Sequence, residues 1–396
     1  MGTTTTWDTN PRHFWLRGEQ PDHAVRHDDH LGFWNVYGYP EIVEILGDWS
    51  RFSSETTRVL PLPPDDPLIA GNLLQLDPPL HDKLRRLVGR AFTPKVVADL
   101  EPRITGLTHD LLDDVDPDDF DLVRDLAYPL PVTVIAELLG VPTADRDLFR
   151  TWMDELFEGV DRFWDRDDEA PSGERIRGPS EALRPLLGYL REHAEQCRRD
   201  ARPGLLGDLV RAEVDDERLS DDEVATFAAV LLVAGHVTTT MLLGNTVLAL
   251  DAHPDQLAKV RGDRALIPSA IEESVRFLPP FAALVRVTTR PEVIADVEVP
   301  ADRLLVLWIG AANRDPRRFA DPDVLDVTRE PGHLGFGRGV HFCLGAPLAR
   351  LEGRIALDVL LDRFPHLRTN PDRRPTFLSP ANLTGVRTLP LLVDRT

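Results

Sequence analysis

Residues 336–354 read FGRGVHFCLGAPLARLEGR and hold Cys343, one of the chain's two cysteines, inside a glycine-rich loop. Glycine tolerates positive φ and lets a backbone lie close to a flat ligand. Pro347 suits the first turn of a helix, and Leu348 and Leu351 then begin an apolar repeat at helical spacing. We therefore expect Cys343 just before a buried helix, where free N–H groups and the positive dipole end favour a thiolate.

A cysteine before a helix is, by itself, more often a structural thiol or a nucleophile. A nucleophile would need a positioned base, and nothing in this stretch marks one. The stretch instead resembles the haem-binding signature of the cytochrome P450 family, F-x-x-G-x-(H/R)-x-C-x-G, in which Gly339 takes the first glycine position. The resemblance implies haem b with Cys343 as the axial iron ligand, and the haem-binding residues Phe336, Gly337, His341 and Gly345. It also implies a mainly α fold with small β-sheets.

Composition narrows the class of protein. The 396 residues include 45 basic and 66 acidic side chains, a net charge of −21, which argues against nucleic acid as the main partner. Two cysteines make no disulfide framework, and residues 1–20 show neither a signal peptide nor a membrane anchor, so we expect a cytoplasmic monomer. The family resemblance implies one domain over residues 1–396, with β-rich parts at about 30–60 and 281–330 and a C-terminal hairpin.

Residues 77–94, DPPLHDKLRRLVGRAFTP, predict a helix with Asp77 as its cap and two prolines in the first turn. His81 and Arg85 are four residues apart and share a helix face. Such a basic run is commonly a solvated surface. Here it resembles the family pattern D-P-P-x-H-x-x-x-R, which implies that His81 and Arg85 hold a haem propionate, and that Arg286 and His341 do the same.

Residues 224–250 carry no formal charge. A segment of that length could span a bilayer, but polar residues lie mid-segment and no basic cluster flanks it, so we expect a central core helix. AGHVTT within it resembles the family's distal motif A/G-G-x-(E/D)-T-(T/S), in which the helix is distorted beside a threonine. The resemblance implies that Ala234, Gly235, Thr238 and Thr239 are the catalytic residues. Val237 departs from the motif, because the family usually has a carboxylate there.

Several segments are expected to surround a substrate pocket. The proline-rich stretch 54–76 predicts a long loop, which is often functional, although a surface loop without a role is the alternative. The charged stretch 165–179 predicts a connection between helices. The resemblance implies that both cover the pocket, and that its lining residues are Leu73, Leu74, Val230, Val237, Ala282, Ala283, Leu284 and Leu383.

The stretch IEESVRF places Glu273 and Arg276 three residues apart, on one helix face. Alone, this E-x-x-R spacing commonly marks a surface ion pair. The family pattern implies a structural brace in the core instead, completed by Arg329.

The reaction implied by the resemblance is the use of O2 to hydroxylate an unactivated C–H bond of a hydrophobic natural product, such as a macrolide or another polyketide. No G-x-G-x-x-G follows a strand, so electrons from NAD(P)H are expected through a ferredoxin reductase and ferredoxin. We expect the ferredoxin on a basic face formed by Lys83, Arg86, Arg90, Arg338, Arg350 and Arg354. The alternatives are epoxidation, aromatic coupling or nitration, which Val237 keeps open, and a haem–thiolate sensor or carrier without turnover.

Overall fold

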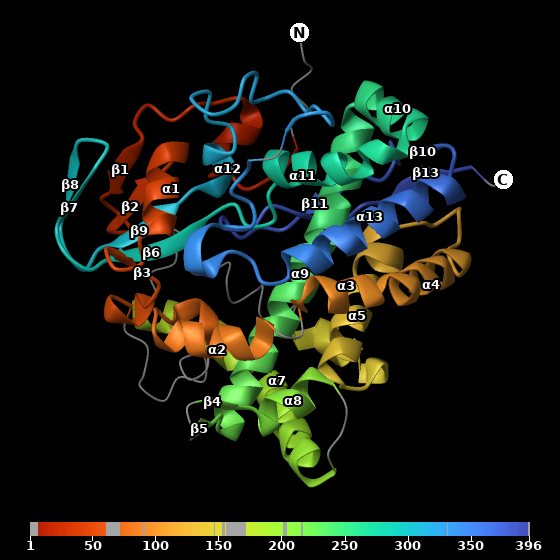
Figure 1. The fold of residues 1–396 in the computed structure, drawn as a ribbon. Coiled ribbons are helices and arrows are strands. Elements are labelled where there is room, and N and C mark those ends of the chain that lie inside the picture. The colour runs from red at the N-terminus through yellow and green to blue at the C-terminus, as the bar shows by residue number, and fades with distance from the viewer. Residues whose placement is uncertain are drawn as a thin grey trace.

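The computed structural model describes residues 7–60, 72–89, 92–145, 147–152, 155, 172–200, 204–214, 217–330 and 332–394, and the side chains of 172–182 and 213–217 are left aside. Helices make up most of the body, and a β-rich region with its sheet lies on one side (Figure 1). The longest described helix, α9 (Asp221–Ala252), runs through the centre and contacts several of the other helices.

The other described α-helices range from a single turn to 29 residues. They are α1 (Tyr39–Gly47), α2 (Leu80–Gly89), α3 (Pro94–Asp99), α4 (Glu101–Asp113), α5 (Pro129–Leu139), α7 (Ser172–Asp200), α8 (Leu205–Arg211), α10 (Pro254–Gly262), α11 (Ile267–Phe277), α12 (Ile309–Ala312) and α13 (Ala346–Arg363). A short π-helix, Val123–Ala127, precedes α5, and the 3-10 turn Gly339–His341 lies in the Cys343 loop.

The sequence explains why α9 forms where it does. Ser220 and Glu223 make a reciprocal capping box: the Glu223 N–H donates to Ser220 Oγ at 3.2 Å, and the Ser220 N–H donates to the Glu223 carboxylate at 2.8 Å. Beyond this start the helix is apolar on all sides, which is typical of a helix buried all round. Its composition would also suit a membrane span, yet 67% of an apolar 18-residue stretch of this helix is buried inside the protein. The helix is therefore packed as a core helix.

The main sheet has five strands in the order β1-β2-β9-β6-β3, with bounds Val25–Asp28, Phe33–Val36, Leu304–Leu307, Leu284–Thr288 and Phe52–Ser53. Only β2 and β9 are parallel, with Trp34 opposite Leu305, and the other pairs are antiparallel. The strand β9 is buried on both faces: Leu305 and Leu307 pack with α1 and α12 in a separate apolar cluster, and Val306 packs in the main core. This packing holds β6, and with it Arg286, against the helical body.

Four two-stranded ladders complete the described sheets: β4 (Glu213–Val214) with β5 (Glu217–Arg218), β7 (Glu292–Ile294) with β8 (Val297–Val299), β10 (Leu367–Thr369) with β13 (Leu391–Val393), and β11 (Thr376–Phe377) with β12 (Val386–Thr388). The β7–β8 hairpin projects at the far left of Figure 1. Strands therefore occur in both predicted β-rich parts and near the C-terminus.

Two local predictions are wrong. The helix α2 begins at Leu80, after the two prolines, and the Asp77 carboxylate accepts hydrogen bonds from Ser53 Oγ and the Ser54 N–H, so it does not cap α2. The stretch 165–179 was expected to be a connection, but its part from Ser172 onward belongs to α7, while 165–171 lies outside the described residues. In the first case a partner distant in sequence takes the carboxylate.

Candidate functional site

A large cavity lies between α9, α13, the Cys343 loop and the sheet. The empty space inside it, together with solvent at its mouth, is about 1470 Å³. Most of its wall is apolar, with Phe227, Phe281 and Ile309 among the large side chains. The cavity is therefore suited to an apolar molecule and has few groups to bind a polar one.

Cys343 is on the wall of this cavity, two residues before the N-cap of α13 at Gly345. The loop is fixed by a 2.9 Å hydrogen bond from the Cys343 N–H to the Phe336 carbonyl. Gly337 and Gly339 have φ of +69° and +70°, and a Cβ at Gly339 would lie 2.3 Å from the Leu46 carbonyl oxygen of α1. The glycine in the signature thus lets the loop pack closely against α1.

Two opposing effects act on the Cys343 thiol. Burial raises its pKa, while the N–H groups of Gly345 and Ala346, which donate to the sulfur, lower it. The N–H groups at the helix start thus lower the pKa of the thiol as expected, but in the protein without a bound metal the effect of burial is larger. A metal cation bonded to the sulfur would reverse this balance, because a coordinating thiol is deprotonated.

Four groups able to carry positive charge meet beside the Cys343 loop: His81 and Arg85 of α2, Arg286 of β6, and His341. The ring centroids of His81 and His341 are 4.4 Å apart. Burial, assisted by the three other groups, lowers the pKa of His341 to about 3, and burial lowers the pKa of Arg286 to about 10. The neighbouring positive charges contribute to the lowered pKa of His341, whereas the lowered pKa of Arg286 comes from burial.

Among the described residues, one member of this cluster has an acidic partner: His81 Nδ1 lies 3.0 Å from the Asp82 carboxylate. Arg85 donates to the Phe342 carbonyl at 2.5 Å and Arg286 to the Val285 carbonyl at 2.7 Å, but no ion pair is present for either guanidinium there. His81 is fully buried, and its Nε2 has no hydrogen-bond partner. Buried cations without counter-ions are costly, so the cluster is suited to bind anionic groups.

These features fit a haem. A thiol at a helix start could hold the iron, positive-φ glycines could lie against a flat ring, and the four-residue cluster could bind two carboxylates. Arginine suits this role because its planar fork matches a carboxylate.

Another part of the cavity wall comes from α9. Val230, Ala234, Gly235, Thr238 and Thr239 all line the cavity. The helix continues unbroken here: the Thr238 hydroxyl donates to the Ala234 carbonyl at 2.6 Å, and the Thr239 hydroxyl donates to the Gly235 carbonyl at 2.8 Å. Both hydroxyl oxygens retain lone pairs that can accept a proton from a molecule in the cavity.

Of the other predicted pocket residues, Leu73, Leu74 and Leu284 line the cavity, and Leu74, at 54% exposed, is the outermost of the three. Four predicted ones are buried but are not among the described lining residues: Val237, Ala282, Ala283 and Leu383. Leu383 forms an isolated antiparallel β-bridge with Phe281, and Phe281 lines the cavity where Leu383 was expected.

Comparison with known proteins decides the family. The family model "Cytochrome P450" matches residues 29–390. The chain belongs to the cytochrome P450 family. It is 45% identical to cyclomarin C epoxidase CymV of Salinispora arenicola, over 93% of either chain. It is 42% identical to erythromycin C-12 hydroxylase of Saccharopolyspora erythraea, over 92% of this chain and 90% of that protein.

Solved structures agree with this assignment. The crystal structure of HmtN, described as a post-tailoring hydroxylase involved in himastatin biosynthesis, matches with a TM-score of 0.88 and 53% identity over 100% of both chains. The fold described above is therefore the P450 fold, and the enzyme is a P450 monooxygenase with haem and O2 implied by its family.

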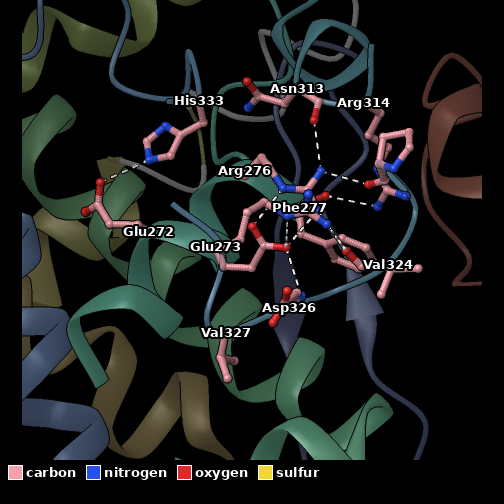
Figure 2. Close-up of polar contacts among 12 residues, drawn as sticks. Glu272, Glu273, Arg276, Phe277, Asn313, Arg314, Val324, Asp326, Val327 and His333 are labelled. Atoms are coloured by element: carbon pink, nitrogen blue, oxygen red, sulfur yellow. Dashed lines mark hydrogen bonds and ion pairs between the residues drawn. The ribbon is translucent and has the colours of Figure 1, made fainter. Parts of the chain in front are cut away.

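A buried ion-pair cluster in this P450 joins α11 to the segment that leads to the Cys343 loop (Figure 2). Arg276 and Glu273 are 2% and 3% exposed, and two hydrogen bonds of 2.7 Å connect them. Arg329 reaches the same carboxylate at 3.3 Å. Arg276 also donates to the Asn313 carbonyl at 2.9 Å, and the Asn313 side chain accepts from the Leu334 N–H at 2.8 Å.

The predicted basic face of the P450 is unevenly charged. Arg86 and Arg338 are exposed, and Lys83 is half-buried. Arg350 forms a double hydrogen bond with Glu272 at 2.6 and 2.8 Å, and Arg354 pairs with Glu101 at 3.0 Å, so carboxylates offset part of their charge. Arg90 lies outside the described residues.

Sequence reasoning missed two polar side chains at the site. Ser54 Oγ is 2.8 Å from His341 Nε2, a contact that no spacing in the sequence indicates. Glu352 lines the cavity from α13 while only 2% exposed. Its signal was available: a carboxylate directly after Leu351, within the apolar stripe of the helix that follows Cys343.

Proposed function

We propose that this P450 hydroxylates a hydrophobic natural product, such as a macrolide or another polyketide, in the cytoplasm. Overall, R–H, O2, two electrons and two protons yield R–OH and water. The observation that carries the proposal is the placement of Cys343 and Thr238 on walls of one large, mostly apolar cavity. A bound haem supplies O2 activation, and thiolate ligation favours O–O cleavage.

The residues of the chain would divide the other tasks. Cys343 is proposed as the axial ligand, and His81, Arg85, Arg286 and His341 as the propionate partners. The apolar wall would orient the substrate, since burial of apolar surface provides most of the binding free energy in such a pocket. Thr238 is proposed to pass protons from the cavity to the reacting oxygen through its hydroxyl, with Thr239 beside it.

Epoxidation is the second candidate, because one relative at 45% identity is named an epoxidase. Both reactions need the same oxidant and differ in whether the substrate presents a C–H bond or a C=C bond at the reacting position. Spectral screening for ligands that bind next to the iron, followed by NMR of the turnover products, separates them, because both reactions add one oxygen and only epoxidation removes the olefin. A product with one added oxygen and no olefin would indicate the epoxide.

The ligand assignment is tested with the reduced CO complex. We expect the strongly red-shifted thiolate-type Soret band in the wild type and in Cys197→Ser, because Cys197 is buried in α7. Cys343→Ala should lose the band. Retention of the band in Cys343→Ala would overturn the assignment of the axial ligand.

Electrons are proposed to arrive from an acidic ferredoxin docked on the Cys343 side. Phe342, directly before the ligand, is 41% exposed, and the cations Arg86 and Arg338 are exposed on the same predicted face. Charge steering makes association rates fall with ionic strength. Arg86→Glu should slow first-electron transfer at low salt and weaken its salt dependence; rates unaffected by both changes would place the docking site elsewhere.

A further inference from the structure

Phe336, the aromatic residue of the haem signature, is contacted by two polar side chains. The Arg350 guanidinium carbon of α13 lies 4.5 Å from the centroid of the Phe336 ring, and the His333 ring centroid lies 5.7 Å from the same point. Phe336 lines the large cavity, and its carbonyl accepts the 2.9 Å hydrogen bond from the Cys343 N–H. Both polar side chains therefore pack on the residue that supports the ligand loop.

One carboxylate, Glu272 of α11, binds both of these side chains. Arg350 donates two hydrogen bonds to it, at 2.6 and 2.8 Å, and His333 Nε2 lies 3.2 Å from it (Figure 2). His333 Nδ1 accepts a 3.1 Å hydrogen bond from the Gly335 N–H, and this contact assigns the ring hydrogen to Nε2, which donates to Glu272. We call Glu272, His333 and Arg350 the Glu272 clamp, because together they enclose Phe336.

The Glu272 clamp holds one negative and one positive charge. Burial acts to raise the pKa of Glu272, but the hydrogen bonds from Arg350 and His333 lower it to about 2. The Glu272 carboxylate in turn raises the pKa of Arg350. The side chains of Glu272 and Arg350 are 15% and 38% exposed, so water screens the pair only in part. The carboxylate is therefore ionised at neutral pH and offsets the charge of Arg350.

The charge of Arg350 also acts on the Cys343 sulfur. Burial is the largest influence on the thiol and raises its pKa, whereas Arg350 is one of the groups that lower it. The Cys343 charge likewise helps to raise the pKa of Arg350, after the contribution of Glu272. The Glu272 clamp thus places a cation whose charge reaches the sulfur, together with the anion that offsets it.

We propose that the Glu272 clamp sets the reduction potential of a haem iron bound to Cys343. Reduction lowers the positive charge of the iron by one, so a nearby cation such as Arg350 favours the ferrous state. Glu272 offsets this cation and keeps the potential low, and His333 fixes the position of the carboxylate. All three are positioning residues that act through Phe336 and through the field at the sulfur. The inference rests on the axial-ligand assignment proposed above.

The first test is a reductive titration of the haem-loaded protein with dithionite and redox mediators, followed by absorption spectroscopy. Glu272→Gln leaves Arg350 without its counter-charge and should raise the potential, whereas Arg350→Gln leaves the carboxylate and should lower it. Each change should shift the ferric–ferrous equilibrium roughly threefold to tenfold, and tenfold corresponds to about 59 mV for one electron. The double variant, which removes both charges, should lie between the two single variants.

Two controls separate charge from structure. Glu101→Gln removes the partner of Arg354, whose ion pair at 3.0 Å lies one turn further along α13 from Cys343 and is exposed on both sides. It should leave the potential unchanged, because the Arg354 charge is more distant and screened by water. Arg350→Lys keeps the charge but loses the planar fork, so its potential should stay closer to wild type than that of Arg350→Gln.

The second test is the C–O stretch of the reduced CO complex, measured by infrared spectroscopy. A cation without a counter-charge draws electron density from the sulfur, and the iron then donates less to CO. Glu272→Gln should therefore raise the C–O stretching frequency, and Arg350→Gln should lower it. This measurement needs neither substrate nor turnover.

The outcomes separate the two proposals. A wild type without the thiolate-type CO band would overturn the ligand assignment, whatever the Glu272 clamp does. With that band intact, potentials that shift in the same direction in Glu272→Gln and Arg350→Gln, or no more than in Glu101→Gln, would overturn the proposal and make the clamp a structural support. If one of the two variants fails to bind haem, the sign of the other still decides.

Discussion

Removal of the Glu273 carboxylate should be one of the most destabilising single changes outside the haem site. The carboxylate accepts two hydrogen bonds from Arg276, one from Arg329 and one of 3.0 Å from the Asp326 N–H. In Glu273→Ala the Arg276 guanidinium stays buried and keeps only backbone carbonyls as partners. Breaking a buried pair in this way costs about 3–5 kcal/mol of unfolding free energy.

That free energy converts into a shift of the unfolding temperature. The entropy of unfolding is about 2.1 cal/mol/K per residue, or about 0.8 kcal/mol/K for 396 residues. The expected decrease in Tm is therefore about 4–6 °C. Differential scanning calorimetry at one fixed scan rate measures it. Haem loss should also quicken, because Arg276 is bonded through Asn313 to the chain before the Cys343 loop.

The matched control is Glu137→Ala. Glu137 also forms a double hydrogen bond with an arginine, Arg103, but that pair is 33% and 50% exposed. Exposed pairs are worth about 0–1 kcal/mol, so the decrease in Tm should stay near 1 °C or less. If Glu273→Ala lowered Tm no more than Glu137→Ala, burial would not be the source of the brace's strength, and the reasoning would be refuted.

Three further outcomes are expected. Arg85→Ala and Arg286→Ala should each lower haem affinity by roughly 2–4 kcal/mol, because a buried carboxylate loses its charged partner. Faster transfer of haem to apomyoglobin measures this loss. An unchanged transfer rate in both variants would remove the two arginines from the haem site. Thr238→Ala should raise the peroxide formed per NADPH with the native substrate, and unaltered coupling would exclude this threonine from proton transfer. Burial raises the pKa of Glu352 from 4.5 to about 8, so between these pH values the folded state holds a proton that the unfolded state releases. The free energy of unfolding should therefore fall by up to about 5 kcal/mol as the pH rises through this range. The free energy of unfolding, measured with urea at about pH 6 and about pH 9, should fall less in Glu352→Gln than in wild type. An equal fall in both proteins would contradict the raised pKa.

Local patterns predicted much of this P450. The glycine signature, Pro347 and the apolar repeat placed a loop before a buried helix, and α13 begins at Ala346. The uncharged stretch 224–250 predicted the core helix α9, and the family motif within it marked the residues that line the cavity. Such features depend on residues close in sequence, and helix periodicity and capping are local effects.

Contacts between distant segments were not predictable in the same way. Asp77 was expected to cap α2 because aspartate commonly does so, yet Ser53 and Ser54 take its carboxylate. Leu383 and Val237 were expected on the cavity wall, and only the packing of neighbouring segments decided that both are buried beside it. A local preference of about 1 kcal/mol is readily overridden by such tertiary contacts.

The sequence by itself determined the family, the haem-ligand candidate and the absence of an acid at Val237, because each is a matter of residue identity at a fixed spacing. Only the tertiary structure decided what surrounds those residues. Arg286 lies near His341 and His81 because β6 is held against the helical body, and Glu352 is buried in the cavity wall because α13 packs against α9. Burial and charge proximity, which set the protonation of both clusters, arise from chain segments that meet only in the folded protein.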